Sequence, residues 1–271
     1  MPSLLTKNYQ LLTLEVAENI LTLTLNRPDK KNAMSIQMMR ELIDVAKRLK
    51  KNRSIQAVII KGAGDVFCAG IDLGDLNNPK NALLGLYELL KPTQSIFQRV
   101  CLIWREVPMP VIVVTHGYCI GAGTQLALAC DFRITDPDCQ FAIMEAKWGL
   151  VPDMGLTQSA LHVLSVDALK ELTMTARLID ADAAKAYGLV SHLDANPEQR
   201  AQALATELAQ RSPDAVLASK RVINYMTKQS NCALYKEKVW QLKLMGGGKN
   251  RKLAIKKAKD SSVQFVKRQF R

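Results

Sequence analysis

Residues 111–131 read VIVVTHGYCIGAGTQLALACD. The segment begins with four apolar, mostly β-branched residues, which is typical of a strand that is buried on both faces. A glycine-bearing turn follows, and residues from about 124 to 129 predict a helix. The stretch therefore predicts a buried strand, a tight turn and a helix, which is the repeating unit of an α/β fold.

The same region carries no charged residue between positions 107 and 130. By length alone such a segment could cross a bilayer. Two prolines, three glycines, a histidine and a glutamine within it argue against a membrane helix. We therefore expect no membrane association.

A second segment has the same design. Residues 67–73 read FCAGIDL and follow the apolar strand AVII at 57–60. Small residues let the backbone approach a ligand closely, and N–H groups at the start of a helix are unpaired donors. Two such groups that converge on one oxygen form an oxyanion hole. Tight packing between a strand and a helix explains each single turn equally well, so both interpretations stay open.

The segments on either side extend this alternation. Residues 11–26 predict a hairpin, and Ser35 is a suitable N-cap for the amphipathic helix that ends near Lys50 and Lys51. A mostly helical stretch is predicted at about 82–105, and short strands at 132–135 and 141–143. After residue 196 only helices are predicted, at 197–210, 213–228, 231–245 and 249–259. We therefore predict an α/β core at 1–196 and a helical segment at 197–271.

The charge of the chain is concentrated at one end. The 271 residues are 48% hydrophobic and 23% charged, which excludes a disordered chain and a disulfide-rich mini-protein. The net charge is +12, and twelve Lys and Arg residues with two acidic residues lie between positions 236 and 271. The remainder of the chain is close to neutral.

The cysteines indicate a reducing compartment. None belongs to a CxxC pair or stands at metal-ligand spacing from a histidine, so we expect no metal site. Most lie in apolar runs and predict buried free thiols. No basic segment followed by an apolar one opens the chain, and together these observations predict a cytoplasmic protein. The cysteines are Cys68, Cys101, Cys119, Cys130, Cys139 and Cys232.

Taken in order, five motifs resemble the crotonase (enoyl-CoA hydratase/isomerase) superfamily, from about residue 10 to residue 268. The resemblance implies an α/β spiral of ββα turns with a C-terminal helical segment that serves oligomerisation. It also implies a homotrimer or a dimer of trimers, an acyl-coenzyme A substrate and no other cofactor. The motifs are LNRP at 25–28, KNA at 31–33, FCAGIDL at 67–73, the run 117–131, and QF at 140–141 followed by Glu145, Gly149 and Pro152.

The resemblance assigns the oxyanion hole to the backbone N–H groups of Ile71 and Ala122. Typical hydratases of the superfamily place two glutamates around a water, and here those positions hold Gln125 and Glu145. An amide cannot exchange a proton at physiological pH, so Gln125 weakens a hydratase mechanism that needs two carboxylates. Gln125 is instead expected to bond the substrate or a water.

A second carboxylate, Asp153, follows Glu145 by eight residues. Together with AGIDL at 69–73 it resembles the dienoyl-CoA isomerase branch, in which the two acids move protons on opposite sides of the acyl chain. The sequence departs from that branch at Gln125, where the branch has Asp. Two other interpretations stay open, namely that Asp153 caps the helix beginning near 155 and that Glu145 is an ion-paired framework residue.

The resemblance places one further group near the nucleotide half of coenzyme A. These residues are Arg27, Lys31, Ala69, Gly70, Asp72 and Leu73.

Double-bond isomerisation is the preferred function, with oxyanion-hole stabilisation of an enolate and carboxylate proton transfer. One alternative is hydration that relies on Glu145. Another is a weakly active protein of this fold that binds RNA or a partner through its basic tail, although only Phe265 and Phe270 lie near the end of the tail, so nucleic-acid binding is not favoured. The tail itself is open to three interpretations: a solvated helical face, contacts to coenzyme A in a neighbouring subunit, or polyanion binding.

Overall fold

The computed structural model describes residues 7–226, 231–247 and 249–264. Its main sheet has the order β1-β2-β3-β4-β6-β8; β1 is antiparallel to β2, and the other pairs are parallel. A smaller sheet pairs β5 with β7. The strands are β1 (Leu12–Ala17), β2 (Ile20–Leu25), β3 (Ala57–Gly62), β4 (Val111–Thr115), β5 (Tyr118–Ile120), β6 (Phe132–Thr135), β7 (Gln140–Ala142) and β8 (His192–Leu193).

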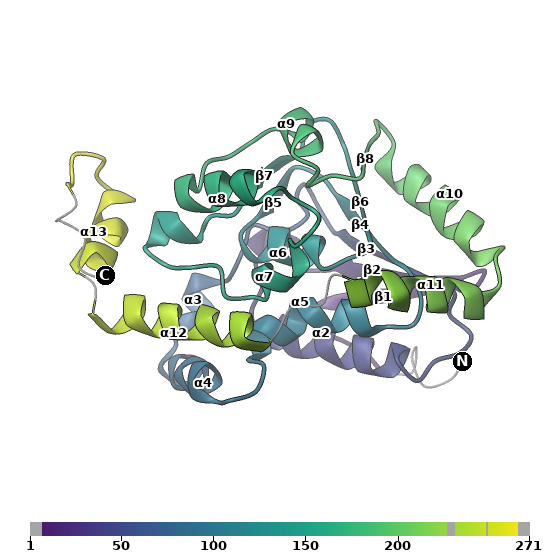
Figure 1. Ribbon diagram of the computed structural model, residues 1–271, viewed down its shortest axis with the longest axis horizontal. Coiled ribbons are helices and arrows are strands. Elements are labelled where there is room, and N and C mark those ends of the chain that lie inside the picture. Colours follow the sequence, from purple (N-terminus) through teal and green to yellow (C-terminus); the bar gives the residue numbers. More distant parts are fainter. Residues whose placement is uncertain (1–6, 227–230, 248, 265–271) are drawn as a thin grey trace.

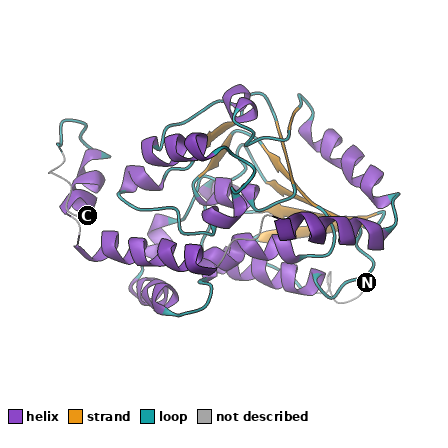
Figure 2. Cartoon of the chain, in the orientation of Figure 1, coloured by secondary structure: helices purple, strands orange, loops and turns teal. Residues whose placement is uncertain are grey.

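Helices surround these strands (Figures 1 and 2). In the first half of the chain they are η1 (Pro28–Lys30), α2 (Ile36–Leu49), α3 (Leu73–Leu76), α4 (Pro79–Leu90), α5 (Ile96–Glu106), α6 (Ala122–Leu128) and η2 (Glu145–Trp148). In the second half they are α7 (Leu156–Ser159), α8 (Val166–Thr175), α9 (Ala181–Ala186), α10 (Pro197–Ala209), α11 (Pro213–Met226), α12 (Asn231–Gly247) and α13 (Lys249–Lys257).

Both faces of the main sheet are covered. In β3, Val58 and Ile60 belong to the large core cluster with α2 and α5, whereas Ala57 and Ile59 belong to a second cluster that includes Ala201 of α10. Alternate residues of a strand point to opposite faces, so a strand covered on both faces reads as an uninterrupted apolar run. This burial explains why 57–60 and 111–114 show no polar alternation.

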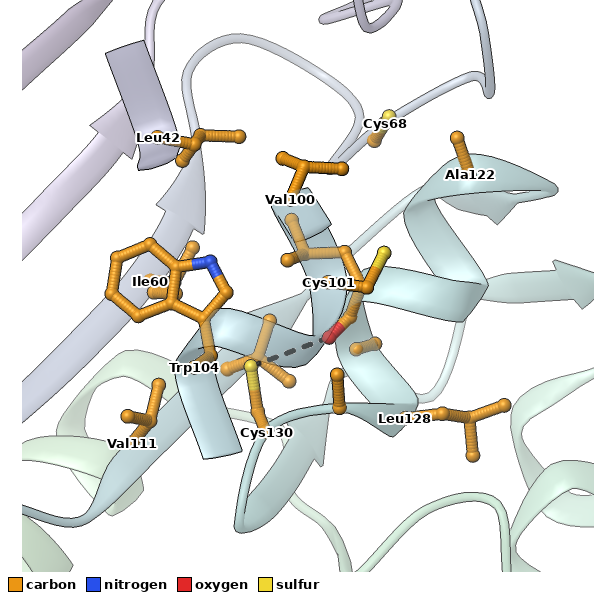
Figure 3. Close-up of a cluster of buried hydrophobic side chains, with 14 of the residues drawn as sticks. Leu42, Ile60, Cys68, Val100, Cys101, Trp104, Val111, Ala122, Leu128 and Cys130 are labelled. Atoms are coloured by element: carbon orange, nitrogen blue, oxygen red, sulfur yellow. Dashed lines mark hydrogen bonds between the residues drawn. The ribbon is translucent and has the colours of Figure 1, made fainter. Parts of the chain in front are cut away.

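The two small-residue turns are anchored in the large core cluster. Figure 3 shows Trp104 of α5 with Ile60 and Val111 in this cluster, and Cys68 and Ala122 belong to it as well. All five side chains are buried, with exposed fractions of 2% or less. The backbone of both turns is therefore anchored in close-packed core, where displacements are costly.

Backbone pairing outside the main sheet forms a second layer. Met34 pairs with Ile71, Cys68 with Cys119, and Phe141 with both Cys119 and Ile179. Strands β2, β3, β4 and β6 are thus each followed by a short extended segment in this second layer, and helical segments then lead the chain back to the main sheet. The predicted α/β class and its C-terminal helices are confirmed.

Three of the predicted segments differ in the structure. The helical stretch at 82–105 is two helices, because Pro92 disfavours a helical conformation at Lys91, which is extended (ψ 145°). The turn after β4 contains a strand, β5, which forms because β7 supplies a parallel partner. Helix α6 begins at Ala122, two residues earlier than predicted.

The five cysteines whose side chains are described are buried and free, as predicted. The side chain of Cys232 and the segment 265–271 lie outside the described residues. Within the described part of the chain, no helix combines the length and apolarity that a membrane span requires. In the same residues, no cluster of three His, Cys, Asp or Glu side chains could hold a metal ion.

Lys220 attaches α11 to the core. Its Nζ donates to the carbonyls of Trp104 (3.2 Å) and Met109 (2.9 Å) and to Asp131 Oδ2 (2.7 Å), and its side chain is 7% exposed. Asp131 Oδ2 also accepts the N–H of Val111 at the start of β4 (2.8 Å). One buried ammonium therefore joins α11, the end of α5 and the central strand.

We expect Lys220→Met to lower the free energy of unfolding by about 3 kcal/mol, because it leaves a part-buried carboxylate and two carbonyls without their cation. Chemical denaturation measures this change. The matched control is Lys61→Met, whose partner Glu198 is 62% exposed, and it should cost at most about 1 kcal/mol. Equal losses in the two variants would contradict the structural role of Lys220.

Candidate active site

The two small-residue turns lie side by side. Cys68 N–H donates to the Tyr118 carbonyl and Ile120 N–H donates to the Cys68 carbonyl, both at 3.0 Å. This parallel pairing sets Cys68 opposite Cys119. Because Ile71 and Ala122 each come three residues after these cysteines, the same register brings the two predicted oxyanion donors together.

Glycine permits the close approach of the two turns. Gly70 has a φ of 103° and Gly121 a φ of 53°, both in the region that residues with a side chain rarely adopt. A Cβ atom on Gly121 would lie 3.8 Å from Gly70 Cα and 3.6 Å from Glu145 Oε1. The turns and the carboxyl of Glu145 therefore meet around one point.

The N–H groups of Ile71 and Ala122 have no acceptor among the described residues. Met34 bonds the Gly70 carbonyl and the Asp72 N–H on either side of Ile71 (2.8 and 3.1 Å), so the Ile71 N–H faces away from Met34. Ala122 is the first residue of α6, where no carbonyl of the helix can accept its N–H. Both residues line the same cavity, so two unpaired donors stand at its wall.

This cavity has a volume of about 340 Å³. Its apolar wall comes from α4, α5 and Trp148 of η2. Ala69, Gly70 and Leu73 line it as well. The other apolar side chains include Leu76, Leu86, Leu89, Phe97, Leu150 and Met154.

Glu145 presents one carboxyl oxygen without a partner. Its Oε1 accepts a hydrogen bond from Gln125 Nε2 (2.7 Å), whereas Oε2 is buried and has none. Burial raises the pKa of Glu145, and its hydrogen bonds, including that of Gln125, oppose the rise. In the described residues no basic side chain pairs with Glu145, so its interpretation as an ion-paired framework residue is wrong.

Gln125 links the two predicted acids. Its side chain is fully buried, donates to Glu145, and accepts the N–H of Met154, the residue after Asp153 (3.1 Å). Both ends of the amide thus have protein partners. This differs from the predicted bond to substrate or water, because the fold places Gln125 between η2 and the loop that carries Asp153.

Asp153 lines the cavity and is 9% exposed. Burial, followed by the negative charges of Glu237 and Glu145, raises the pKa of Asp153 to about 8. The interpretation of Asp153 as a helix cap is wrong: α7 has Gly155 at its N-cap, without a side-chain cap bond. The first N–H groups of α7 instead find their acceptor in Glu237 of α12.

The residues predicted near coenzyme A also build the first turn. Arg27 Nη1 contacts Asp72 Oδ2 at 2.6 Å and the Ala33 carbonyl at 3.1 Å. Asp72 is in addition the N-cap of α3, accepting the Asp75 N–H at 3.0 Å. Lys31 is exposed, and its carbonyl accepts the N–H of Ala69 (3.0 Å). Arg27 and Asp72 therefore hold the turn in place through their mutual ion pair.

Residues of the C-terminal helices were missed by the sequence analysis. Gln241, Met245 and Arg251 line the same cavity, so its wall includes part of the segment 197–271. One signal was available, because Glu237 is one of only two acidic residues in the strongly basic stretch 236–271. The oligomerisation role predicted for this segment stays a prediction.

Known proteins share this sequence and fold. The profile of the enoyl-CoA hydratase/isomerase family matches residues 15–252. The mitochondrial Delta(3,5)-Delta(2,4)-dienoyl-CoA isomerase of Rattus norvegicus is 35% identical over 233 residues, which cover 82% of this chain and 71% of the rat protein. The Homo sapiens protein of the same description is 36% identical over 224 residues, covering 79% and 68%.

A solved structure agrees. An enoyl-CoA hydratase/isomerase from Pseudoalteromonas atlantica superposes with a TM-score of 0.82 at 26% identity, over 95% of this chain and 100% of that one.

One prediction is overturned by these relatives. The rat and human proteins are named mitochondrial, which contradicts the predicted cytoplasmic location. That prediction rested on buried free thiols and on the lack of a basic segment followed by an apolar one at the start of the chain. Free thiols indicate a reducing environment and do not identify one compartment.

The family profile covers most of the chain, the relatives exceed 30% identity, and the fold matches at full length. The chain therefore belongs to the enoyl-CoA hydratase/isomerase family, the crotonase superfamily.

Proposed function

We propose that this enzyme isomerises dienoyl-coenzyme A thioesters by moving two conjugated double bonds between the 3,5 and 2,4 positions. The observation that carries the proposal is one apolar cavity in which two unpaired backbone N–H groups stand beside two buried carboxyl groups, Glu145 and Asp153. The names of the rat and human relatives support the same reaction.

The thioester oxygen would accept hydrogen bonds from the N–H groups of Ile71 and Ala122. These donors stabilise the negative charge that develops on that oxygen when a proton leaves the neighbouring carbon, and removing one donor of this kind costs roughly 10²- to 10³-fold in rate. No reorganisation is needed, because the donors are already held by the register between the two turns.

The two carboxyl groups then divide the proton transfer. With a pKa of about 8, Asp153 holds its proton at neutral pH and acts as the donor. Ionised Glu145 accepts the proton from C2, the carbon next to the thioester, through its unpartnered Oε2, and a trienolate conjugated from the thioester oxygen to C6 is left. Asp153 gives its proton to C6, the double bonds move from the 3,5 to the 2,4 positions, and proton exchange with solvent restores both acids.

Hydration fits the site less well. It requires a water held between two proton-exchanging groups, and Gln125 is an amide whose two ends are engaged by Glu145 and Met154. We further propose that Arg27, Lys31 and the turn at 69–73 face the nucleotide half of coenzyme A. The trimeric or hexameric assembly stays a prediction of the sequence. RNA or partner binding by the basic tail stays an untested alternative, of which the sequence does not favour nucleic-acid binding.

A panel of 2-enoyl, 3-enoyl and 3,5-dienoyl thioesters tests the proposal. We expect 3,5-dienoyl thioesters to be converted without a change in mass, measured by ultraviolet absorbance and mass spectrometry. Glu145→Gln and Asp153→Asn should each lower kcat by roughly 10²- to 10⁴-fold with little change in KM, since each removes a proton carrier. Lys61→Met is the control. Addition of water as the main reaction, or full activity in both variants, would refute the assignment.

The pH profile of kcat/KM should be bell-shaped. On the alkaline side activity falls near pH 8, because Asp153 loses the proton that it donates. On the acid side activity falls as Glu145 becomes protonated, above the pH at which an ordinary glutamate would be, because its pKa is raised by burial. A rate that stays constant from pH 6 to pH 10 contradicts this division of roles.

Asp153 should also make the fold less stable as the pH rises. Its folded-state pKa of about 8 exceeds its ordinary value of 3.8, so between these values the unfolded chain binds fewer protons and the free energy of unfolding falls with pH. Asp153→Asn removes this dependence. We expect its Tm advantage over wild type to widen from pH 5 to pH 8, measured by thermal denaturation. A difference that is the same at both pH values would show that Asp153 titrates normally.

A further inference from the structure

Helix α12 is bonded to the loop that carries Asp153 on both sides of that residue. Gln241 Oε1 accepts the N–H of Val151 (3.2 Å), two residues before Asp153. Glu237 accepts the N–H groups of Gly155 and Thr157, two and four residues after it (both 3.1 Å). Figure 1 shows α12 running beneath α7, against which it packs. The loop between 151 and 157 is thus held by two side chains of α12, Glu237 and Gln241, which lie about one helical turn apart.

Glu237 accepts hydrogen bonds from four groups, three of which are N–H groups. Oε1 accepts from Thr157 N and Thr157 Oγ1 (2.5 Å), and Oε2 accepts from Gly155 N and Gln98 Nε2 (3.2 Å). The orientation of the Gln98 amide is fixed by Ser95, whose N–H donates to Gln98 Oε1. Three of these four groups are N–H donors, which cannot accept the hydrogen of a protonated carboxyl, and only the Thr157 hydroxyl could. Burial raises the pKa of Glu237, and its hydrogen bonds from Thr157, Gln98 and Gly155 oppose the rise. The arrangement fits a carboxylate that is 4% exposed and negatively charged.

Asp153 faces ionisable groups from four elements. Glu145 approaches from η2, Glu237 from α12 and the thiol of Cys101 from α5, and Arg251 of α13 lines the same cavity. Burial raises the pKa of Cys101 well above its ordinary value, so this thiol is neutral. Two carboxylates therefore act on Asp153, one from η2 and one from α12.

We propose that Glu237 and Gln241 are positioning residues for Asp153: together they hold its loop against Glu145, and the buried charge of Glu237 keeps Asp153 protonated. This inference rests on the proposed function, since it concerns the proton donor of that reaction. It also assigns α12 a part in the site, beside the oligomerisation role predicted for the C-terminal segment. The charge and the loop contact are separable, because Gln241 supplies the contact without a charge.

The helix keeps other attachments when Glu237 is altered. Lys238 Nζ donates to the carbonyls of Lys91 and Thr93, and Gln98 Nε2 donates to the Leu234 carbonyl (2.9 Å). These bonds tie α12 to the connection between α4 and α5. Removing the charge of Glu237 therefore leaves α12 anchored.

The kinetic test compares three variants of the full chain on the 3,5-dienoyl thioester. In Glu237→Gln we expect kcat to fall, KM to stay unchanged, and the alkaline limb of kcat/KM to move to lower pH by roughly one unit, as expected for removal of a neighbouring like charge. Gln241→Met should lower kcat without moving the limb downward. Glu207→Gln, which removes an exposed glutamate of α10, is the matched control and should behave as wild type.

A second test needs no substrate. Thermal denaturation from pH 5 to pH 8 is measured for wild type, Asp153→Asn, Glu237→Gln and the double variant. The Tm advantage of Asp153→Asn at pH 8 should be smaller in the Glu237→Gln background, because Asp153 then ionises at lower cost. The comparison uses differences within each background, so a general loss of stability in Glu237→Gln cancels.

Two results would overturn the proposal. One is an alkaline limb that stays in place in Glu237→Gln together with an unchanged Tm advantage of Asp153→Asn. The other is a wild-type kcat in Gln241→Met. A wild-type enzyme that does not turn over dienoyl thioesters refutes the proposed reaction instead, and in that case the four-variant denaturation still decides whether Glu237 controls Asp153.

Discussion

The parallel backbone pairing of Cys68 with Cys119 is the constraint on which the rest of the site depends. It connects two turns that are 51 residues apart in the sequence and aligns Gly70 with Gly121 and Ile71 with Ala122. Both cysteines are fully buried in the large core cluster, so the register is fixed by close packing as well as by hydrogen bonds. Side chains at 71 and 122 are free to vary, since only their backbone N–H groups enter the proposed chemistry.

Around this backbone frame the fold gathers carboxyl groups that repel one another when ionised, more strongly than they would in water. Glu145, Asp153 and Glu237 come from η2, the loop before α7, and α12, and each is largely removed from solvent. Their environments differ: Glu237 accepts four hydrogen bonds, Glu145 accepts one from the amide of Gln125, and Asp153 is hydrogen-bonded by its own backbone and by Gln241 but lies near two other carboxyl groups. Burial, like charges and unequal hydrogen bonding give neighbouring acids different pKa values, and the proposed mechanism uses this difference to supply a base and an acid from one site.

The sequence predicted those elements whose signals are local. The hairpin at 11–26, the Ser35 cap and the apolar strands at 57–60 and 111–114 all have periodicity or capping chemistry that a short window contains, and the structure has them. Strand β5 was missed because its three residues form a strand only by pairing with β7, which lies 20 residues later in the sequence. Asp153 was open to interpretation as a helix cap because a short window cannot reveal that Glu237, 84 residues later, already occupies that place.

By itself the sequence determined the α/β class, the two glycine-bearing turns and, through its family motifs, the residues that we propose bear the chemistry. These follow from residue types whose backbone preferences and reactivity are intrinsic. Only the tertiary structure decided that Gln125 joins Glu145 to the Asp153 loop, that Arg27 and Asp72 bind each other, and that α12 forms part of the cavity. Hydrogen-bond partners and desolvation depend on which distant segments pack together, and the charge state of a buried carboxyl depends on both.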